Sequence, residues 1–178
     1  MHRREGSGMT IKAIEGAAIL AALAFTPAAT PLAAQAQTNA VAHRWESYAN
    51  ARYGYAICYP ADLLVPEPEA DNGDGRAFQG KDGASLRVFG HYNAAEQTMA
   101  EAMAGDALGL AHDGAVISYR ASRPGWYVLS GRIGDTIVYR RTIAAGDRRM
   151  TFVLRYPASQ AALWNPITAR LGRCFAAG

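Results

Sequence analysis

The sequence predicts an α+β fold with a central antiparallel sheet of about six strands flanked by helices. Short stretches of alternating side-chain character recur after residue 45, as expected for strands with one buried face. Turn-forming residues separate the strand-like stretches between residues 116 and 156, and connections this short make neighbouring strands antiparallel. One helical stretch precedes this run and another ends the chain, a segregated order typical of α+β domains.

The first 36 residues have the pattern of a cleavable signal peptide. Arg3, Arg4 and Lys12 supply positive charge, residues 16–25 form an uncharged apolar run, and residues 34–36 (Ala-Gln-Ala) match a cleavage site. The apolar run has about 10 residues, whereas a membrane-spanning helix needs about 20. An uncleaved membrane anchor is therefore the weaker alternative.

Cleavage at this site predicts a soluble mature chain that begins near Gln37, whether translation starts at Met1 or at Met9. We expect residues 37–44 to form a flexible segment and residues 45–178 to form a single domain, periplasmic or secreted, without a stable membrane anchor. The mature chain holds 15 basic and 13 acidic residues, a formal net charge of +2. This excess is too small for a general nucleic-acid binder.

The first half of the domain begins with a strand over residues 53–59 (YGYAICY), where aromatic and β-branched residues alternate with small ones. Residues 61–75, rich in acids, prolines and glycines, are predicted to be a loop. Short strands are expected at 76–79 and 85–91. Asn93 and Glu96 then match a capping box, which predicts a helix from about 94 to 108.

The second half is predicted to be an antiparallel meander followed by a helix. Its expected strands cover residues 116–120, 126–132, 136–143 and 150–156. Trp164, Ile167, Leu171 and Cys174 then recur at steps of three and four residues, which indicates an amphipathic helix. Pro166 is compatible either with the first turn of this helix or with a kink inside a longer one.

The strand YGYAICYP at residues 53–60 resembles the entry motif of the Mog1/PsbP-like fold, and the C-terminal helix with Trp164, followed by Arg173-Cys174-Phe175, looks similar too. The likeness covers most of residues 45–176. It implies a central antiparallel sheet flanked by helices, in proteins that are mostly non-enzymatic accessory or binding factors. The matching positions are packing positions, so no functional residue is carried over, and the cysteines at 58 and 174 depart from the family pattern.

Cys58 and Cys174 are the only cysteines, and both lie in the exported part. An even count in an oxidising compartment favours a disulfide between them. Ala56 shares a strand side with Cys58, which lets a helix that carries Cys174 approach closely. The alternatives are two buried free thiols or a reactive cysteine, although no CxxC pair is present.

Arginines are concentrated late in the chain. The segment 120–155 carries a net charge of +6, whereas residues 62–82 carry −4. One interpretation is a guanidinium surface for a small anionic ligand or an acidic envelope protein. The other is a solvated sheet face whose charges discourage edge pairing. The candidate anion-binding residues are Arg132, Arg140, Arg141, Arg149 and Arg155.

No catalytic, nucleotide-binding or zinc-binding motif occurs in the sequence, and no metal or cofactor is expected. The acidic stretch 71–75 lacks the ligand spacing of an EF-hand, so a solvated turn is favoured over an irregular calcium site. We expect a non-enzymatic binding or accessory protein. The alternative is a hydrolase-type envelope enzyme whose acid/base site combines Glu67, Asp71 or Asp74 of the 67–74 loop with His91 or His112.

Overall fold

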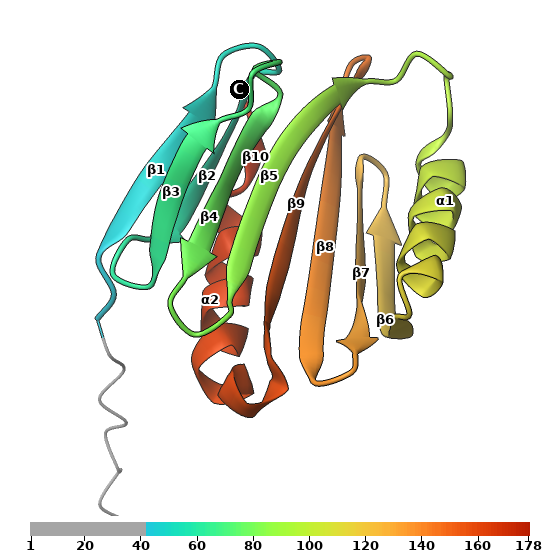
Figure 1. The fold of residues 1–178 in the computed structure, drawn as a ribbon. Coiled ribbons are helices and arrows are strands. Elements are labelled where there is room, and N and C mark those ends of the chain that lie inside the picture. The colour runs from blue at the N-terminus through green and yellow to red at the C-terminus, as the bar shows by residue number, and fades with distance from the viewer. Residues whose placement is uncertain (1–41) are drawn as a thin grey trace, which may run out of the picture. The chain divides into compact units, whose positions relative to one another are not determined.

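The computed structural model describes residues 42–178, so the signal-peptide pattern and most of segment 37–44 lie outside the described residues. The described part contains two antiparallel sheets and two α-helices (Figure 1). Its elements are β1 (Trp45–Asn50), β2 (Tyr55–Pro60), β3 (Leu64–Glu69), β4 (Gly75–Gly80), β5 (Ser85–Tyr92), α1 (Met99–His112), β6 (Val116–Arg123), β7 (Trp126–Ile133), β8 (Thr136–Ala145), β9 (Arg148–Pro157), a short 3-10 helix (Ala158–Gln160), α2 (Ala161–Cys174) and β10 (Ala176–Ala177).

The larger sheet has seven strands in the order β3-β4-β5-β9-β8-β7-β6, and the smaller sheet has the order β1-β2-β10. The α+β class and the meander of β6 to β9 are confirmed, but the expectation of one sheet of about six strands was wrong. The strand that contains Cys58 does not join the main sheet. It pairs instead with β1 and with the C-terminal β10, a contact that local patterns cannot reveal.

The prediction of a loop over residues 61–75 was wrong because this segment contains β3. β3 is an edge strand and pairs only with β4, with a register shift between Pro66 and Glu69. Proline cannot donate a hydrogen bond to a neighbouring strand, but on an edge strand that missing N–H can face solvent. The two prolines therefore mark an edge here instead of excluding a strand.

The first helix begins later than the 94–108 prediction. Glu96 has a φ of 51°, in the left-handed region, so a right-handed helix cannot run through it. Thr98 caps the helix instead: its hydroxyl accepts from the Glu101 N–H while the Glu101 carboxylate accepts from the Thr98 N–H. Asn93 forms a local turn with Gln97. The capping box is therefore formed by Thr98 and Glu101, and the prediction that Asn93 and Glu96 form it was wrong.

Each face of the larger sheet packs against a different partner. On one face, alternate residues such as Leu86 and Phe152 pack against the smaller sheet and α2. On the opposite face, Tyr127 and Leu129 of β7 pack against Ala107 and other α1 residues. Successive side chains of a strand point to opposite faces, so the same strands supply both clusters. α1 makes its sheet contacts over β6 and β7, and the β4–β5 part of that face is left without a helix (Figure 1).

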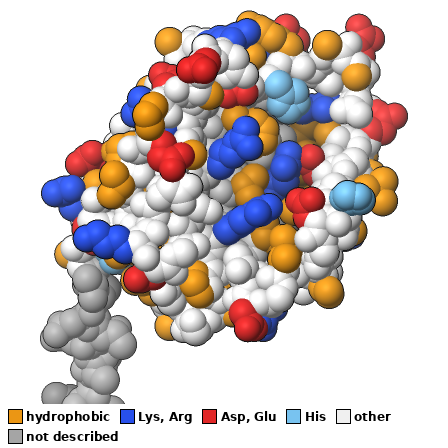
Figure 2. Space-filling view, in the orientation of Figure 1, with side chains coloured by type: hydrophobic (Ala, Val, Ile, Leu, Met, Phe, Trp, Pro, Cys, Tyr) orange, Lys and Arg blue, Asp and Glu red, His pale blue; other side chains and the backbone are white. Residues whose placement is uncertain are grey.

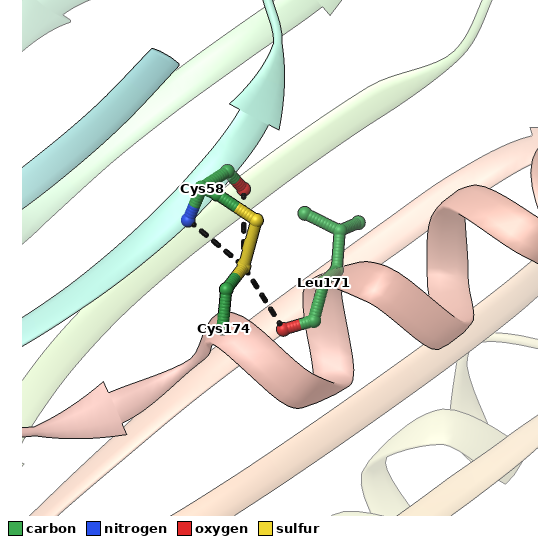
Figure 3. The surroundings of a disulfide bond; sticks show 3 residues. All are labelled: Cys58, Leu171 and Cys174. Atoms are coloured by element: carbon green, nitrogen blue, oxygen red, sulfur yellow. Dashed lines mark hydrogen bonds between the residues drawn. A yellow bond between two sulfur atoms is a disulfide. The ribbon is translucent and has the colours of Figure 1, made fainter. Parts of the chain in front are cut away.

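Cys58 in β2 and Cys174 at the end of α2 form a disulfide, with their Cα atoms 5.8 Å apart (Figure 3). The predicted bridge is therefore present, and it ties the beginning of the domain to its end across a sequence separation of 116. α2 packs directly against β2. Within residues 42–178, no helix is both long and apolar enough to cross a membrane.

Candidate functional site

The five candidate arginines do not share one surface. Arg140, Arg149 and Arg155 lie on the α1 face of the larger sheet. Arg141 is adjacent to Arg140 in β8 and therefore points to the opposite face, where its guanidinium lies 4.7 Å from the centre of the Trp126 ring. Arg132 alternates in β7 with the α1-facing residues and pairs with Asp135 at the turn. Because successive residues of a strand point to opposite faces, arginines that are close in sequence lie on different faces of the sheet.

A groove of about 520 Å³ lies between α1 and the open part of the larger sheet. Its floor includes a row of direct cross-strand neighbours: Ala77 (β4), Arg87 (β5), Val153 (β9) and Arg140 (β8). The next row brings Arg155 beside Ser85. Figure 2 shows basic side chains gathered at the centre of this face, with acidic side chains and histidine nearby. The volume falls within the range of small-molecule sites.

The wall that α1 provides is partly bare backbone. Gly105 and Gly109, one helical turn apart, both line the groove, and a Cβ added at either position would meet nothing within 4 Å. Glycine inside a helix costs about 1 kcal/mol relative to alanine. Helix stability alone would therefore favour alanine at both positions. The missing side chains leave space that a long side chain would fill.

The charges of the groove are only partly compensated. Arg140 Nε lies 2.6 Å from Asp106 Oδ2 of α1, an ion pair without hydrogen-bond alignment of that N–H. Arg155 lies 3.8 Å from Asp113, a weaker and more exposed pair. Among residues 42–178, Arg87 forms no ion pair. It is therefore the cation of this groove that is available to an anionic ligand.

A smaller polar cavity adjoins the groove at Asp106 and Arg140. Tyr127 donates its hydroxyl proton to Asp106, and burial together with this bond raises the pKa of Tyr127 to about 12. Partial desolvation of the ring and repulsion by the Arg149 guanidinium lower the pKa of His91. His91 is thus neutral at physiological pH and adds no positive charge to the site.

Arg149 has a structural position, although the sequence suggested it for anion binding. Its residue surface is only 4% exposed. The guanidinium donates to the side-chain oxygen of Gln97 at 3.0 Å, to the Gln97 carbonyl and, at 3.4 Å, to the Thr98 carbonyl. All of these acceptors belong to the segment that leads into α1. Arg149 therefore fixes the beginning of α1 to the sheet.

The acids and histidines of the alternative enzyme site line separate cavities. Glu67 and Asp74 line a cavity beside β3 and β4, whereas His91 borders the cavity with Tyr127 and His112 borders the groove. Asp74 is held in a local turn with Asn72. In the described part of the chain, no three His, Cys, Asp or Glu side chains are grouped as metal ligands.

Arg87, Phe89, Asp106 and the two helix glycines were missed as candidates. The strand predicted over residues 85–91 already implied that Arg87, Phe89 and His91 share one side, because alternate residues do so. The spacing of four residues between Gly105 and Gly109 was also visible in the sequence. No local pattern, however, indicated that this strand side and this helix side face each other.

No protein-family model and no curated protein sequence matches this chain. Among solved structures, the chain is similar to cyanobacterial PsbP (CyanoP) from Synechocystis sp. PCC 6803, seen in solution, with a TM-score of 0.61. The match covers 84% of this chain and 100% of that chain. The fold is PsbP-like. The resemblance noted from the YGYAICYP strand and the C-terminal helix is thereby confirmed.

Sequence identity to cyanobacterial PsbP is 14%, so the likeness concerns the fold alone. A PsbP-like fold does not specify a ligand, because one fold can carry unrelated sites. The chemistry of this protein therefore has to be inferred from its own groove.

Proposed function

We propose that this protein is an exported, non-enzymatic binding protein of the bacterial envelope that holds an anionic ligand in the groove between α1 and the larger sheet. The observation that carries the proposal is the groove itself: Arg87, Arg140 and Arg155 converge on a hollow that α1 leaves open at Gly105 and Gly109. Guanidinium groups bind carboxylates, sulfonates and phosphates through charge-assisted hydrogen bonds. No catalytic constellation is needed for this role.

Two features support export. Residues 1–36 have the pattern of a signal peptide, and the bridge between Cys58 and Cys174 is of the kind that persists in oxidising compartments. The disulfide lies on the α2 side of the larger sheet, away from the groove. It thus supports the compartment without taking part in binding.

Expression of the full chain in a Gram-negative host tests export. We expect the protein in the periplasmic fraction with a new N-terminus near Gln37, because the apolar run is too short for a stable anchor and a cleavage site follows it. N-terminal sequencing and mass spectrometry of the fractions provide the measurement. Unprocessed chain confined to the cytosol would contradict export.

A thermal-shift screen with organic carboxylates, sulfonates, phosphates and acidic peptides tests anion binding. At least one class should raise the melting temperature, because a ligand that binds only the folded state stabilises it. A double variant, Arg87→Gln with Arg155→Gln, should lose this shift. Arg120→Gln is the matched control, since Arg120 is an exposed strand arginine outside the groove.

Two results would overturn anion binding at this site. One is the absence of any shift across all four classes. The other is an equal shift in the wild type and the double variant, which would place the ligand elsewhere. A shift lost only in the double variant supports the groove.

A further inference from the structure

We infer that the ligand is a small amphipathic monoanion, with its charged group at Arg87 and its apolar body along the floor of the groove. This inference rests on the proposed function and narrows it. Phosphate or an acidic peptide would also satisfy the proposed function. Neither of them is divided into a charged group and an apolar body, so neither fits this narrower inference.

The floor offers apolar surface inside a cationic site. Ala77, Phe89 and Val153 line the groove and are only partly buried, so each exposes apolar atoms to the hollow. Leu110 adds an apolar contact from α1. A ligand with an apolar body would remove these surfaces from water, which stabilises a complex in proportion to the area buried.

The charged group has a defined place. The guanidinium carbons of Arg87 and Arg140 lie 5.2 and 5.8 Å from the centre of the same Phe89 ring, so both cations converge there from β5 and β8. Asp106 already pairs with Arg140. The arginines of the lining number three and its carboxylates, Asp106 and Asp113, number two, which leaves an excess of one positive charge between them. One negative charge on the ligand balances it.

The glycine wall fits an apolar body better than a polar one. At Gly105 and Gly109 the helix offers methylene groups and backbone whose N–H and C=O groups are bonded within α1. Such a wall has few free donors or acceptors that could form hydrogen bonds with a sugar or a peptide. It allows close approach of a chain or a ring, which a long side chain at either position would prevent.

Isothermal titration of the exported protein with three probes tests this inference. Decanoate carries an apolar chain and a charge, decanol has the chain alone, and acetate has the charge alone. We expect decanoate to bind at least about tenfold more tightly than either other probe, because loss of a charge-assisted contact or of the apolar contact each costs at least about a factor of ten. Arg87→Gln should weaken decanoate about tenfold and leave decanol unchanged.

The glycines provide a second, independent readout. Gly109→Leu should abolish decanoate binding by filling the groove, whereas Gly109→Ala should retain it and raise the melting temperature, since alanine is the better helix former. If Gly109→Leu does not fold, the Arg87→Gln variant and the comparison of the three probes still test whether the ligand is amphipathic.

The outcomes separate this inference from the function on which it rests. Acetate or decanol binding as tightly as decanoate would overturn the amphipathic ligand. So would a thermal-shift screen in which phosphates or acidic peptides stabilise the protein through Arg87 while decanoate does not bind, and this result would leave the anion-binding function standing. Failure of every anion in both experiments would overturn both.

Discussion

Removing the disulfide, with Cys58→Ala and Cys174→Ala together, is expected to lower the free energy of unfolding by about 4 kcal/mol. The bridge spans 116 residues, and chain entropy assigns about 4–5 kcal/mol to a loop of this length. For a domain of this size the melting temperature should fall by about 10–20 °C. Urea unfolding of oxidised and reduced wild type and of the double variant measures the effect.

The reduced wild type is the matched control, because it lacks the bridge but keeps both sulfur atoms. It should resemble the double variant to within about 1 kcal/mol, the size of a small volume change in a packed site. A change below about 1 kcal/mol on reduction would mean that the reduced, unfolded chain retains structure, against the chain-entropy account. Two reactive thiols in the unreduced, denatured protein would contradict the bridge itself.

Replacing Arg149 by leucine is expected to lower the free energy of unfolding by about 3 kcal/mol and to release the beginning of α1. A hydrogen bond to a charged group contributes about 1.5–3 kcal/mol, and the buried Arg149 guanidinium donates to the side-chain oxygen of Gln97 and to the carbonyls of Gln97 and Thr98. Urea unfolding, with hydrogen exchange of the α1 amides, provides the measurement. Anion binding should weaken as well, since α1 forms one wall of the groove.

Arg141→Leu is the matched control, because Arg141 occupies the neighbouring strand β8 on the opposite face and stacks on Trp126. Its loss should cost no more than about 1 kcal/mol, the scale of a partly exposed cation–π contact. Equal losses of stability in the two variants, or unchanged exchange at the start of α1 in Arg149→Leu, would show that Arg149 does not anchor the helix.

The candidate arginines show which part of the site can be predicted from sequence. The period of two in β8 and β9 was visible, so the alternation of Arg140 with Arg141 could have been deduced from the strand assignment alone. The elements that pack against each face of the strand could not be deduced in this way. Arg149 was grouped with ligand-binding residues because its charge suggests exposure, yet packing buries it against backbone carbonyls.

The errors at β3 and α1 have the same origin. Pro66 and Pro68 argue against a central strand, and only the position of β3 at the sheet edge makes them acceptable. Two capping boxes compete within residues 93–101, and the tether from Arg149 to Gln97 and Thr98 accompanies the second. In both places the local pattern led to the wrong prediction, because contacts with distant segments accompany the structure that forms.

By itself, the sequence determined the α+β class, the meander, the amphipathic C-terminal helix and the pairing of its only two cysteines. Each follows from a local period or from a count. Only the tertiary structure decided that Arg87, Arg140 and Arg155 meet across β5, β8 and β9, and that Gly105 and Gly109 face them. Strand order and register depend on contacts between distant segments, whereas a period describes only which residues of one segment share a side.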